Sequence, residues 1–419
     1  MTGLDTASSA PGGVRFLGTR GAYWRLLIRG AALLMVTLGI YRFWLITDVR
    51  RFLWANSEVA GETLEYTGRP VEILIGFLVA VAILAPVYAG FFIAALDLGT
   101  LGQMSGAIAF LGLAVLGQYA IYRARRYRLT RTIFRGLRFH QGGSAWGYAL
   151  RAVLWWALTG LTLGLAYPFQ LASLERYKMR HTYYGDLQGR FEASGFRLLL
   201  RGLPMWLMLL APLALAVVAF AEAVDWKALG EAIAAGTDSL GSRIEGGNPQ
   251  LPDVIVFAML MGGTSASLAA LLYPAFQAVI LRWWLSGLRF GDIALASNLH
   301  MRNVYGAYVR FLWYGLLLSI ALGLLSIPAL MLIGTIGSKM PDSIVAEAVG
   351  SGVALVGYVV MALGFSTVYR ATVLLSLWQL GMESLHLSGL SALERVQASG
   401  TPSSAVGEGL ADALHVGGY

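Results

Sequence analysis

The segment FLGTRGAYWRLLIRGAALLMVTLGIYRFWLITDVRR, residues 16–51, decides the fold because it occurs twice. The second copy is GGSAWGYALRAVLWWALTGLTLGLAYPFQLASLER, residues 142–176. The copies align with a constant offset of 125, and the aligned pairs are Gly18 with Gly143, Tyr23 with Tyr148, Thr37-Leu38-Gly39 with Thr162-Leu163-Gly164, and Arg51 with Arg176. A duplicated apolar segment of this kind indicates an architecture built from repeats.

The composition indicates a membrane protein with several spans. Of 419 residues, 57% are hydrophobic and only 13% are charged, and the mean hydropathy is +0.65. Apolar runs long enough to cross a hydrocarbon core of about 30 Å recur along the chain. The chain has no cysteine, which excludes disulfides, thiolate metal sites and cysteine nucleophiles. Residues 1–11 lack the pattern of a cleaved signal peptide, so we expect none to be removed.

Six apolar runs are predicted to span the membrane. They cover residues 71–96, 101–122, 198–221, 254–281, 309–336 and 345–366. Arginine-bearing segments at 45–70, 123–143, 173–197 and 282–310 are expected on the cytoplasmic side, and the acidic segment 222–253 outside, because cytoplasmic loops are enriched in Lys and Arg. We attribute the net charge of +8 to this bias and not to nucleic-acid binding.

The two repeated segments conflict with a simple span. Each has basic residues at both ends, which a full crossing would place on opposite sides of the membrane. The helical run from Tyr23 to the Thr-Leu-Gly is about 14 residues, or about 21 Å, which is too short to cross alone. We therefore predict re-entrant or shallow helical hairpins that turn at Gly39 and Gly164, packed at the centre of the bundle. An ordinary tilted span containing a glycine stays open as the alternative.

A shorter repeat marks the polar segments. An apolar residue stands four positions before a glycine at Leu64, Phe139, Phe191 and Leu385. Residues 57–66, 133–139 and 182–191 alternate and contain turn-forming glycines, so we expect short β-hairpins. Lone hairpins are marginal in water, and several on one membrane face could pair into a small sheet. Simple amphipathic loops of similar composition are the alternative.

These patterns predict the following organisation. The fold class is an all-α polytopic membrane protein with six spanning helices, two repeated re-entrant or shallow segments and short cytoplasmic β-hairpins. We expect a disordered N-terminus at 1–15, a first repeat at 16–143, a second repeat at 144–387 and a flexible tail at 388–419. Both termini are expected in the cytoplasm.

The chain resembles a known family. Thr37-Leu-Gly-Ile-Tyr-Arg-Phe-Trp44, Arg50-Arg51 and Glu65-Tyr-Thr-Gly68 resemble the YjgN-like family of bacterial inner-membrane proteins, a domain of unknown function, over roughly residues 16–380. The resemblance implies a multi-span protein of the bacterial inner membrane and supplies no reaction, ligand, cofactor or catalytic residue. The second copy departs from the pattern, with Ala166-Tyr-Pro-Phe169 where the first has Tyr41-Arg-Phe-Trp44.

The sequence shows no set of residues for catalysis or metal binding. The five histidines form no HxxxH or His-acid pair at ligand spacing, and no GxSxG, GxxxxGK[ST] or HExxH motif is present. Ionisable residues inside the predicted spans, which usually mark transport pathways, are scarce. We therefore expect no enzyme activity, no cofactor and no metal.

Two groups of residues are candidates for binding. The two Thr-Leu-Gly turns are ligand-binding candidates, with Thr37, Gly39, Thr162 and Gly164 as the residues. The basic run at 123–138 interleaves with aromatic residues, and its candidates for anionic lipid headgroups are Arg125, Arg126, Arg128 and Arg131. A plain topology signal explains the same run as the alternative.

Two functions fit these observations. The first is a non-enzymatic scaffold, lipid-interacting or envelope-maintenance protein, with membrane lipids as partners and a protein partner or homo-oligomer left open. The second is a transporter or channel for a small or amphiphilic solute, with a cavity lined by the two Thr-Leu-Gly copies. Scarce buried charges favour the first, and the duplication favours the second.

Overall fold

The computed structural model describes residues 13–97, 99–234, 248–339, 344–399 and 405–416. The chain forms two compact units, one of residues 1–195 with 281–419 and one of residues 196–280. The expected disordered N-terminus lies outside the described residues up to position 12. Strand β1 (Val14–Phe16) begins at Val14, within the range 1–15 that the sequence analysis assigned to the N-terminus.

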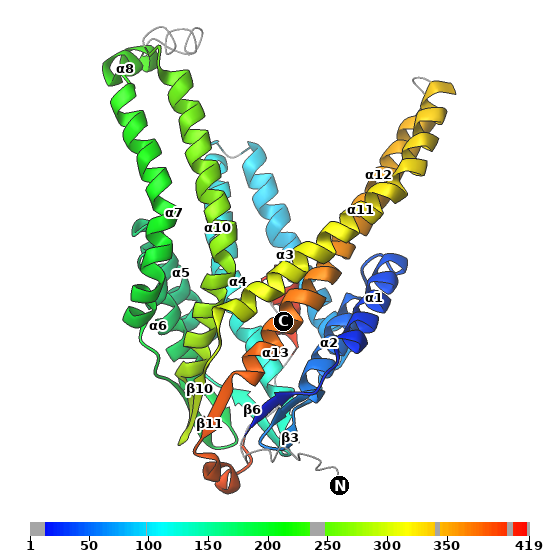
Figure 1. The fold of residues 1–419 in the computed structure, drawn as a ribbon, viewed down its shortest axis with the longest axis vertical. Coiled ribbons are helices and arrows are strands. Elements are labelled where there is room, and N and C mark those ends of the chain that lie inside the picture. Colours follow the sequence, from blue (N-terminus) through cyan, green and yellow to red (C-terminus); the bar gives the residue numbers. More distant parts are fainter. Residues whose placement is uncertain (1–12, 98, 235–247, 340–343, 400–404, 417–419) are drawn as a thin grey trace, which may run out of the picture. The chain divides into compact units, whose positions relative to one another are not determined.

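Among the described residues, six helices are long and apolar enough to cross a membrane, in agreement with the six predicted apolar runs. They are α3 (Pro70–Asp97), α4 (Gly99–Thr130), α7 (Gly195–Ala223), α10 (Leu251–Gly287), α11 (Met301–Lys339) and α12 (Ile344–Tyr369), as labelled in Figure 1. A π-helical turn at Arg370–Leu374 joins α12 to α13 (Leu375–Glu383). The second unit consists of α8 (Trp226–Ala234) with most of α7 and α10.

Each copy of the repeated segment is a pair of helices and not one continuous helix. The first copy contains α1 (Arg20–Val36) and α2 (Arg42–Ala55). The second contains α5 (Ala145–Leu161) and α6 (Tyr167–Arg180). Thr19 and Ser144 cap α1 and α5, since their hydroxyls accept hydrogen bonds from backbone N–H groups of the first turn. We call these pairs the α1–α2 hairpin and the α5–α6 hairpin.

Antiparallel strands follow the helices at regular places. They are β1 (Val14–Phe16), β2 (Ser57–Val59), β3 (Glu62–Thr63), β4 (Glu65–Tyr66), β5 (Thr132–Phe134), β6 (Leu137–Gln141), β7 (Thr182–Tyr184), β8 (Leu187–Phe191), β9 (Leu288–Phe290), β10 (Ile293–Ser297) and β11 (Leu385–Ser388). Eight of them pair in the order β11-β10-β9-β8-β7-β6-β5-β4, and β1, β2 and β3 form a second sheet. The strands gather at one end of the first unit (Figure 1).

The two sheets join into a ring of strands. One residue, Leu64, separates β3 from β4, so this stretch pairs with β2 on one side and with β5 on the other. At the other end, Gly13 forms an isolated bridge with His386 of β11. A ring removes the exposed strand edges at which other chains could pair. The short strands that the sequence predicted are thus parts of one continuous structure.

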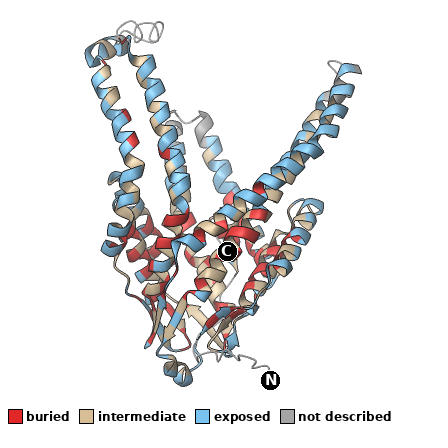
Figure 2. Cartoon of the chain, in the orientation of Figure 1, coloured by how far each residue is buried: buried red, intermediate tan, exposed pale blue. Residues whose placement is uncertain are grey.

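The core of the first unit lies where the helical hairpins meet the strands. One cluster joins Tyr23 and Leu27 of α1 to Leu45 and Val49 of α2 and to Leu375 of α13. A second cluster joins α4, α5 and α6 around the buried Tyr122. Figure 2 shows buried residues concentrated here, whereas the outer parts of α11 and α12 are exposed. Exposed apolar helices of this kind suit a lipid environment.

The segment at 388–419, predicted as a flexible tail, contains two helices among its described residues. Residues Leu390–Arg395 form a 3₁₀ helix, and Val406–Ala413 form helix α14. Helix α14 packs against both α3 and α4. Its Ala411 lies with Ala120 and Ala124 of α4 in a small apolar cluster.

Candidate functional site

The Thr-Leu-Gly turns reverse the chain through two residues in the left-handed region. Leu38 has φ +49° and Gly39 φ +91°, and Leu163 and Gly164 have +47° and +92°. The Thr37 hydroxyl donates to the Leu33 carbonyl (2.7 Å) and accepts from the Tyr41 N–H (3.0 Å). Both of its hydrogen-bonding roles are therefore used within the turn.

The second turn repeats this geometry. The Thr162 hydroxyl donates to the Leu158 carbonyl at 2.8 Å and accepts from the Ala166 N–H at 3.0 Å. Sequence analysis identified both threonines. In the structure, the side chains of both stabilise the turn between two helices by the same pair of hydrogen bonds. The prediction that Thr37, Gly39, Thr162 and Gly164 bind a ligand is not tested by this geometry and stays a prediction.

The turns are exposed tips, not the lining of a cavity. Leu38 is 94% exposed and Leu163 is 72% exposed. A Cβ atom added to Gly39 would meet nothing within 4 Å. The expectation that both turns lie at the centre of the bundle is therefore wrong for this chain. Each hairpin instead presents an apolar tip that its own chain leaves uncovered.

The arginines of the basic run point largely into the protein. Arg125 donates to the Thr182 hydroxyl at 2.8 Å, and Arg126 donates to the carbonyls of Gly142 and Gly143 at 2.7 and 2.5 Å. These contacts tie the end of α4 to the strands and to the start of α5. Whether lipid headgroups also contact them is a separate prediction, which this geometry does not test.

The other two candidates face different elements. Arg131 forms an ion pair with Glu72 at the start of α3, at 2.8 Å, and Tyr127 donates to the same carboxylate at 2.9 Å. Arg128 lies within electrostatic reach of Glu408. Of the four arginines proposed for lipid, each thus has a role inside the chain.

Two acidic residues of α14 reach arginines of α2. Glu408 pairs with Arg50, and Asp412 pairs with Arg42. Arg50 and Glu408 are buried, and Arg50 also donates to the Tyr66 hydroxyl at 3.0 Å. Burial raises the pKa of Asp412 above its usual range, although Arg42 opposes the shift. We call this set, with Arg128, the α14 ion cluster.

A second buried charge occupies the position of the second copy that corresponds to Arg50. Glu175 of α6 pairs with Lys178 of the same helix. Burial raises its pKa, but Lys178 and Arg125 lower it more, so the net pKa lies below the usual range. The two copies thus bury opposite charges at the same position.

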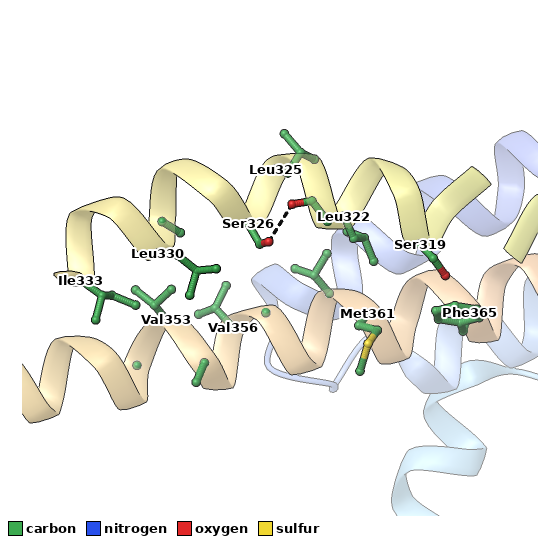
Figure 3. Close-up of a pocket in the computed structure, with 16 residues that line it drawn as sticks. Ser319, Leu322, Leu325, Ser326, Leu330, Ile333, Val353, Val356, Met361 and Phe365 are labelled. Atoms are coloured by element: carbon green, nitrogen blue, oxygen red, sulfur yellow. Dashed lines mark hydrogen bonds between the residues drawn. The ribbon is translucent and has the colours of Figure 1, made fainter. Parts of the chain in front are cut away.

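A hydrophobic groove of about 750 Å³ runs between α11 and α12. Its walls carry Ser319, Ser326, Leu330, Val353, Met361 and Phe365 (Figure 3). The Ser326 hydroxyl donates to the Gly323 carbonyl at 2.7 Å, and the Ser319 hydroxyl to the Gly315 carbonyl at 2.9 Å. Both hydroxyls are therefore engaged within α11, and the groove offers apolar surface that suits an acyl chain.

Within the part of the chain that the structure describes, no group of three or more His, Asp or Glu side chains is arranged to hold a metal ion. His140 stacks on Tyr183 with ring centres 4.9 Å apart, and burial lowers its pKa. His386 contacts Asn298 at 3.0 Å. Both histidines lie on strands of the ring, His140 on β6 and His386 on β11.

Sequence reasoning missed Arg50, Glu408 and Asp412. The pairs are separated by 358 and 370 residues, so no local pattern connects them. One signal was available in the tail itself. Residues 406–413 place Glu408 and Asp412 four positions apart, on one side of a helix, among glycine and alanine.

The comparisons with known proteins agree on a family. The model of a family described as bacterial protein of unknown function (DUF898) matches residues 11–413. The chain belongs to this family. The inner membrane protein YjgN of Escherichia coli O157:H7 is 27% identical over 168 residues, which are 40% of this chain and 38% of that protein. The match therefore spans well under half of the YjgN chain. No solved structure matches this DUF898 member.

Proposed function

We propose that this chain is a non-enzymatic, multi-pass protein of the bacterial inner membrane that acts through contact with lipid, as a lipid-interacting or scaffold protein. The six apolar helices and the likeness to an inner membrane protein support the location. The observation that carries the lipid role is the pair of exposed apolar tips. Both hairpins lie shallowly in one leaflet, and the strand ring lies in the cytoplasm with both termini.

The distribution of charge along the hairpins supports this placement. Arg25 and Arg29 are exposed on α1, and Arg151 is exposed on α5. Leu38 follows Arg29 by nine residues, or about 14 Å of helix, and Leu163 follows Arg151 by 12 residues, or about 18 Å. Both lengths are well below the roughly 30 Å of a hydrocarbon core. Arginines at the headgroups with tips below them give a shallow insertion.

A scaffold role is limited by the closed ring. A partner cannot add a strand where no strand edge is open, so a protein partner or a second copy would bind loop tips or side-chain surfaces. The sharper test concerns the tips. The chain has no cysteine, so single cysteines replacing Leu38 or Leu163 can carry an environment-sensitive fluorophore in lipid nanodiscs.

We expect lipids brominated on their acyl chains to quench both fluorophores, and a water-soluble quencher to have little effect. A cysteine replacing Glu62, exposed on strand β3, is the control and should show the reverse. Quenching of the tip fluorophores by the aqueous reagent alone would refute the shallow insertion and remove the basis of the lipid role.

The groove between α11 and α12 favours a second function, transport of an amphiphilic solute. Its volume of about 750 Å³ is within the range of ligand pockets, roughly 300–1,000 Å³. We expect Gly357→Leu to reduce binding of a fluorescent fatty acid because Gly357 lines the groove. Gly306→Leu, on the same helix pair but outside the residues that line the groove, is the control. Equal binding by both variants would remove this alternative.

A further inference from the structure

Helix α14 is held on three sides by the first repeat. Its residues four positions apart form three faces, and these are Glu408 and Asp412 toward α2, Ala405 and Gly409 toward α3, and Gly407 and Ala411 toward α4. Residues i and i+4 share a face of an α-helix, so all three contacts form at once. The C-terminal helix thus fits one place in the molecule.

Glycine makes this fit specific. A Cβ atom on Gly409 would overlap the backbone of Gly76 in α3, and one on Gly407 would overlap Arg123 in α4. The backbones therefore approach more closely than any other residue permits, as in small-residue helix packing. A tail resting loosely on the surface would not require two glycines at these positions.

Without α14, the α14 ion cluster consists of three arginines and no carboxylate, because both of its acidic residues lie on α14. Arg42 and Arg50 pair with the two carboxylates, Arg128 lies within electrostatic reach of Glu408, and Arg50 is only 3% exposed. A buried guanidinium requires a negative partner because the lost hydration is large. The space that α14 fills is therefore a site for an anion, and the protein supplies Glu408 and Asp412 as its occupants.

The docked α14 helix does not satisfy every polar atom at its interface with α2. Among the described residues, the Arg50 Nε, Glu408 Oε2 and Asp412 Oδ2 atoms are buried and make no hydrogen bond. Each buried atom without a partner opposes docking. A ligand whose oxygens reach Arg50 Nε, the one donor among these three atoms, could therefore compete with α14, since an arginine fork matches a phosphate or carboxylate group well.

We propose that Arg42, Arg50 and Arg128 bind the anionic group of an amphiphile, and that α14 is the built-in occupant that this ligand displaces. The anionic group is a phosphate or a carboxylate, and the apolar body replaces Ala405 and Ala411 between α3 and α4. This inference rests on the proposed lipid-interacting function and assigns it a site. Displacement frees the C-terminal segment and so reports the bound ligand to the cytoplasmic side.

The docked state can be measured by a cysteine pair. A Cβ atom on Gly117 of α4 would lie 3.5 Å from a methyl carbon of Val416, which is close enough for a disulfide or a short cross-linker. Gly117→Cys with Val416→Cys is introduced into the full chain, which has no other cysteine. Cross-linking is followed in nanodiscs of phosphatidylcholine, where we expect high yield.

Two ligand arms distinguish the source of the anion. Nanodiscs with equal amounts of phosphatidylglycerol and phosphatidylcholine should lower the cross-linking rate about fivefold, which identifies a lipid headgroup. Inorganic phosphate is added to phosphatidylcholine nanodiscs in the other arm, and a similar loss there identifies a free anion. A loss in the lipid arm supports the amphiphile, whereas a loss with phosphate alone keeps the arginine site but overturns the amphiphile. An unchanged rate in both arms overturns it.

Charge variants provide an independent test on the same cysteine pair. Glu408→Gln should lower the cross-linking rate about tenfold because Arg50 loses its charged partner. Glu394→Gln, which removes the same charge from the 3₁₀ helix, should leave the rate unchanged. If the fluorophores on Leu38 and Leu163 are quenched by lipid while α14 stays cross-linked in both arms, the lipid role stands and the α14 site falls.

Discussion

At the scale of single residues, the two copies differ most at one aligned position. Arg50 and Glu175 are both buried, yet their charges are opposite. Arg50 is neutralised by the C-terminal helix, whereas Glu175 is neutralised by Lys178 and by Arg125 of α4. The sequence showed the alignment of the copies, but it did not predict which charges would be buried, because their partners come from distant segments.

Glu175 gives a prediction for acid stability. Its pKa lies below the usual value in the folded protein, so its contribution to stability is present above the unfolded pKa and is lost as the pH falls through the folded pKa. We expect Glu175→Gln to lower the free energy of unfolding at pH 7 by about 3 kcal/mol, since it leaves buried cations uncompensated. The parent loses this contribution when Glu175 is protonated. Below pH about 4.5 the free energy of unfolding should therefore fall less in the variant than in the parent.

Thermal unfolding in detergent, followed by tryptophan fluorescence between pH 7 and pH 3, measures both effects. The matched control is Glu192→Gln, because Glu192 is 58% exposed in its ion pair with Arg289. Exposed pairs contribute about 0–1 kcal/mol, so this variant should behave like the parent. Equal behaviour of the two variants would contradict a stabilising buried Glu175.

At the scale of elements, the sequence indicated where each repeated segment turns. The short distance between the Tyr and the Thr-Leu-Gly, with basic residues at both ends, indicated a reversal at Gly39 and Gly164. The structure has that reversal in both copies. The exposure of the two tips was not predictable, because sequence periodicity does not say whether a neighbouring element covers an apolar tip.

The turn conformation predicts opposite effects for two glycine substitutions in one hairpin. Gly39→Ala should destabilise the protein by about 1 kcal/mol, because φ of +91° is unfavourable for a residue with a Cβ atom. Gly21→Ala, inside α1 with open space around it, should stabilise by up to about 1 kcal/mol through helix propensity. Thermal unfolding of the two variants in one detergent is the measurement, and a shift of the same sign in both would argue against the turn.

At the scale of the whole molecule, composition was sufficient to predict the six spans, but the strand ring was not predictable. The strands are two to five residues long, and partners such as β10 and β11 come from separate regions of the chain. Their pairing is set by the helices that bring their ends together. The small sheet expected from the glycine repeat described only part of the ring.

The membrane orientation is open to a direct experiment on the whole chain. Arg190 on β8 and Lys227 on α8 are both exposed. We expect a cysteine at 190 to be protected from a membrane-impermeant maleimide in intact cells, and a cysteine at 227 to be labelled, because the segment containing Lys227 is acidic and the strand segments are arginine-rich. Ala172 is unsuitable as a reporter because it is only 2% exposed. Labelling of residue 190 from outside would reverse the orientation and exclude a cytoplasmic ring.

The closure of the strand ring has a consequence for biosynthesis. Strand order follows chain order from β4 to β11, so each strand can pair with its predecessor as the chain leaves the ribosome. The pairing of β11 with β10 and the bridge between Gly13 and His386 must wait until the last span has been inserted. A nascent chain that stops before residue 385 keeps two unpaired strand edges, and quality-control proteases can distinguish it from the finished protein by that difference alone.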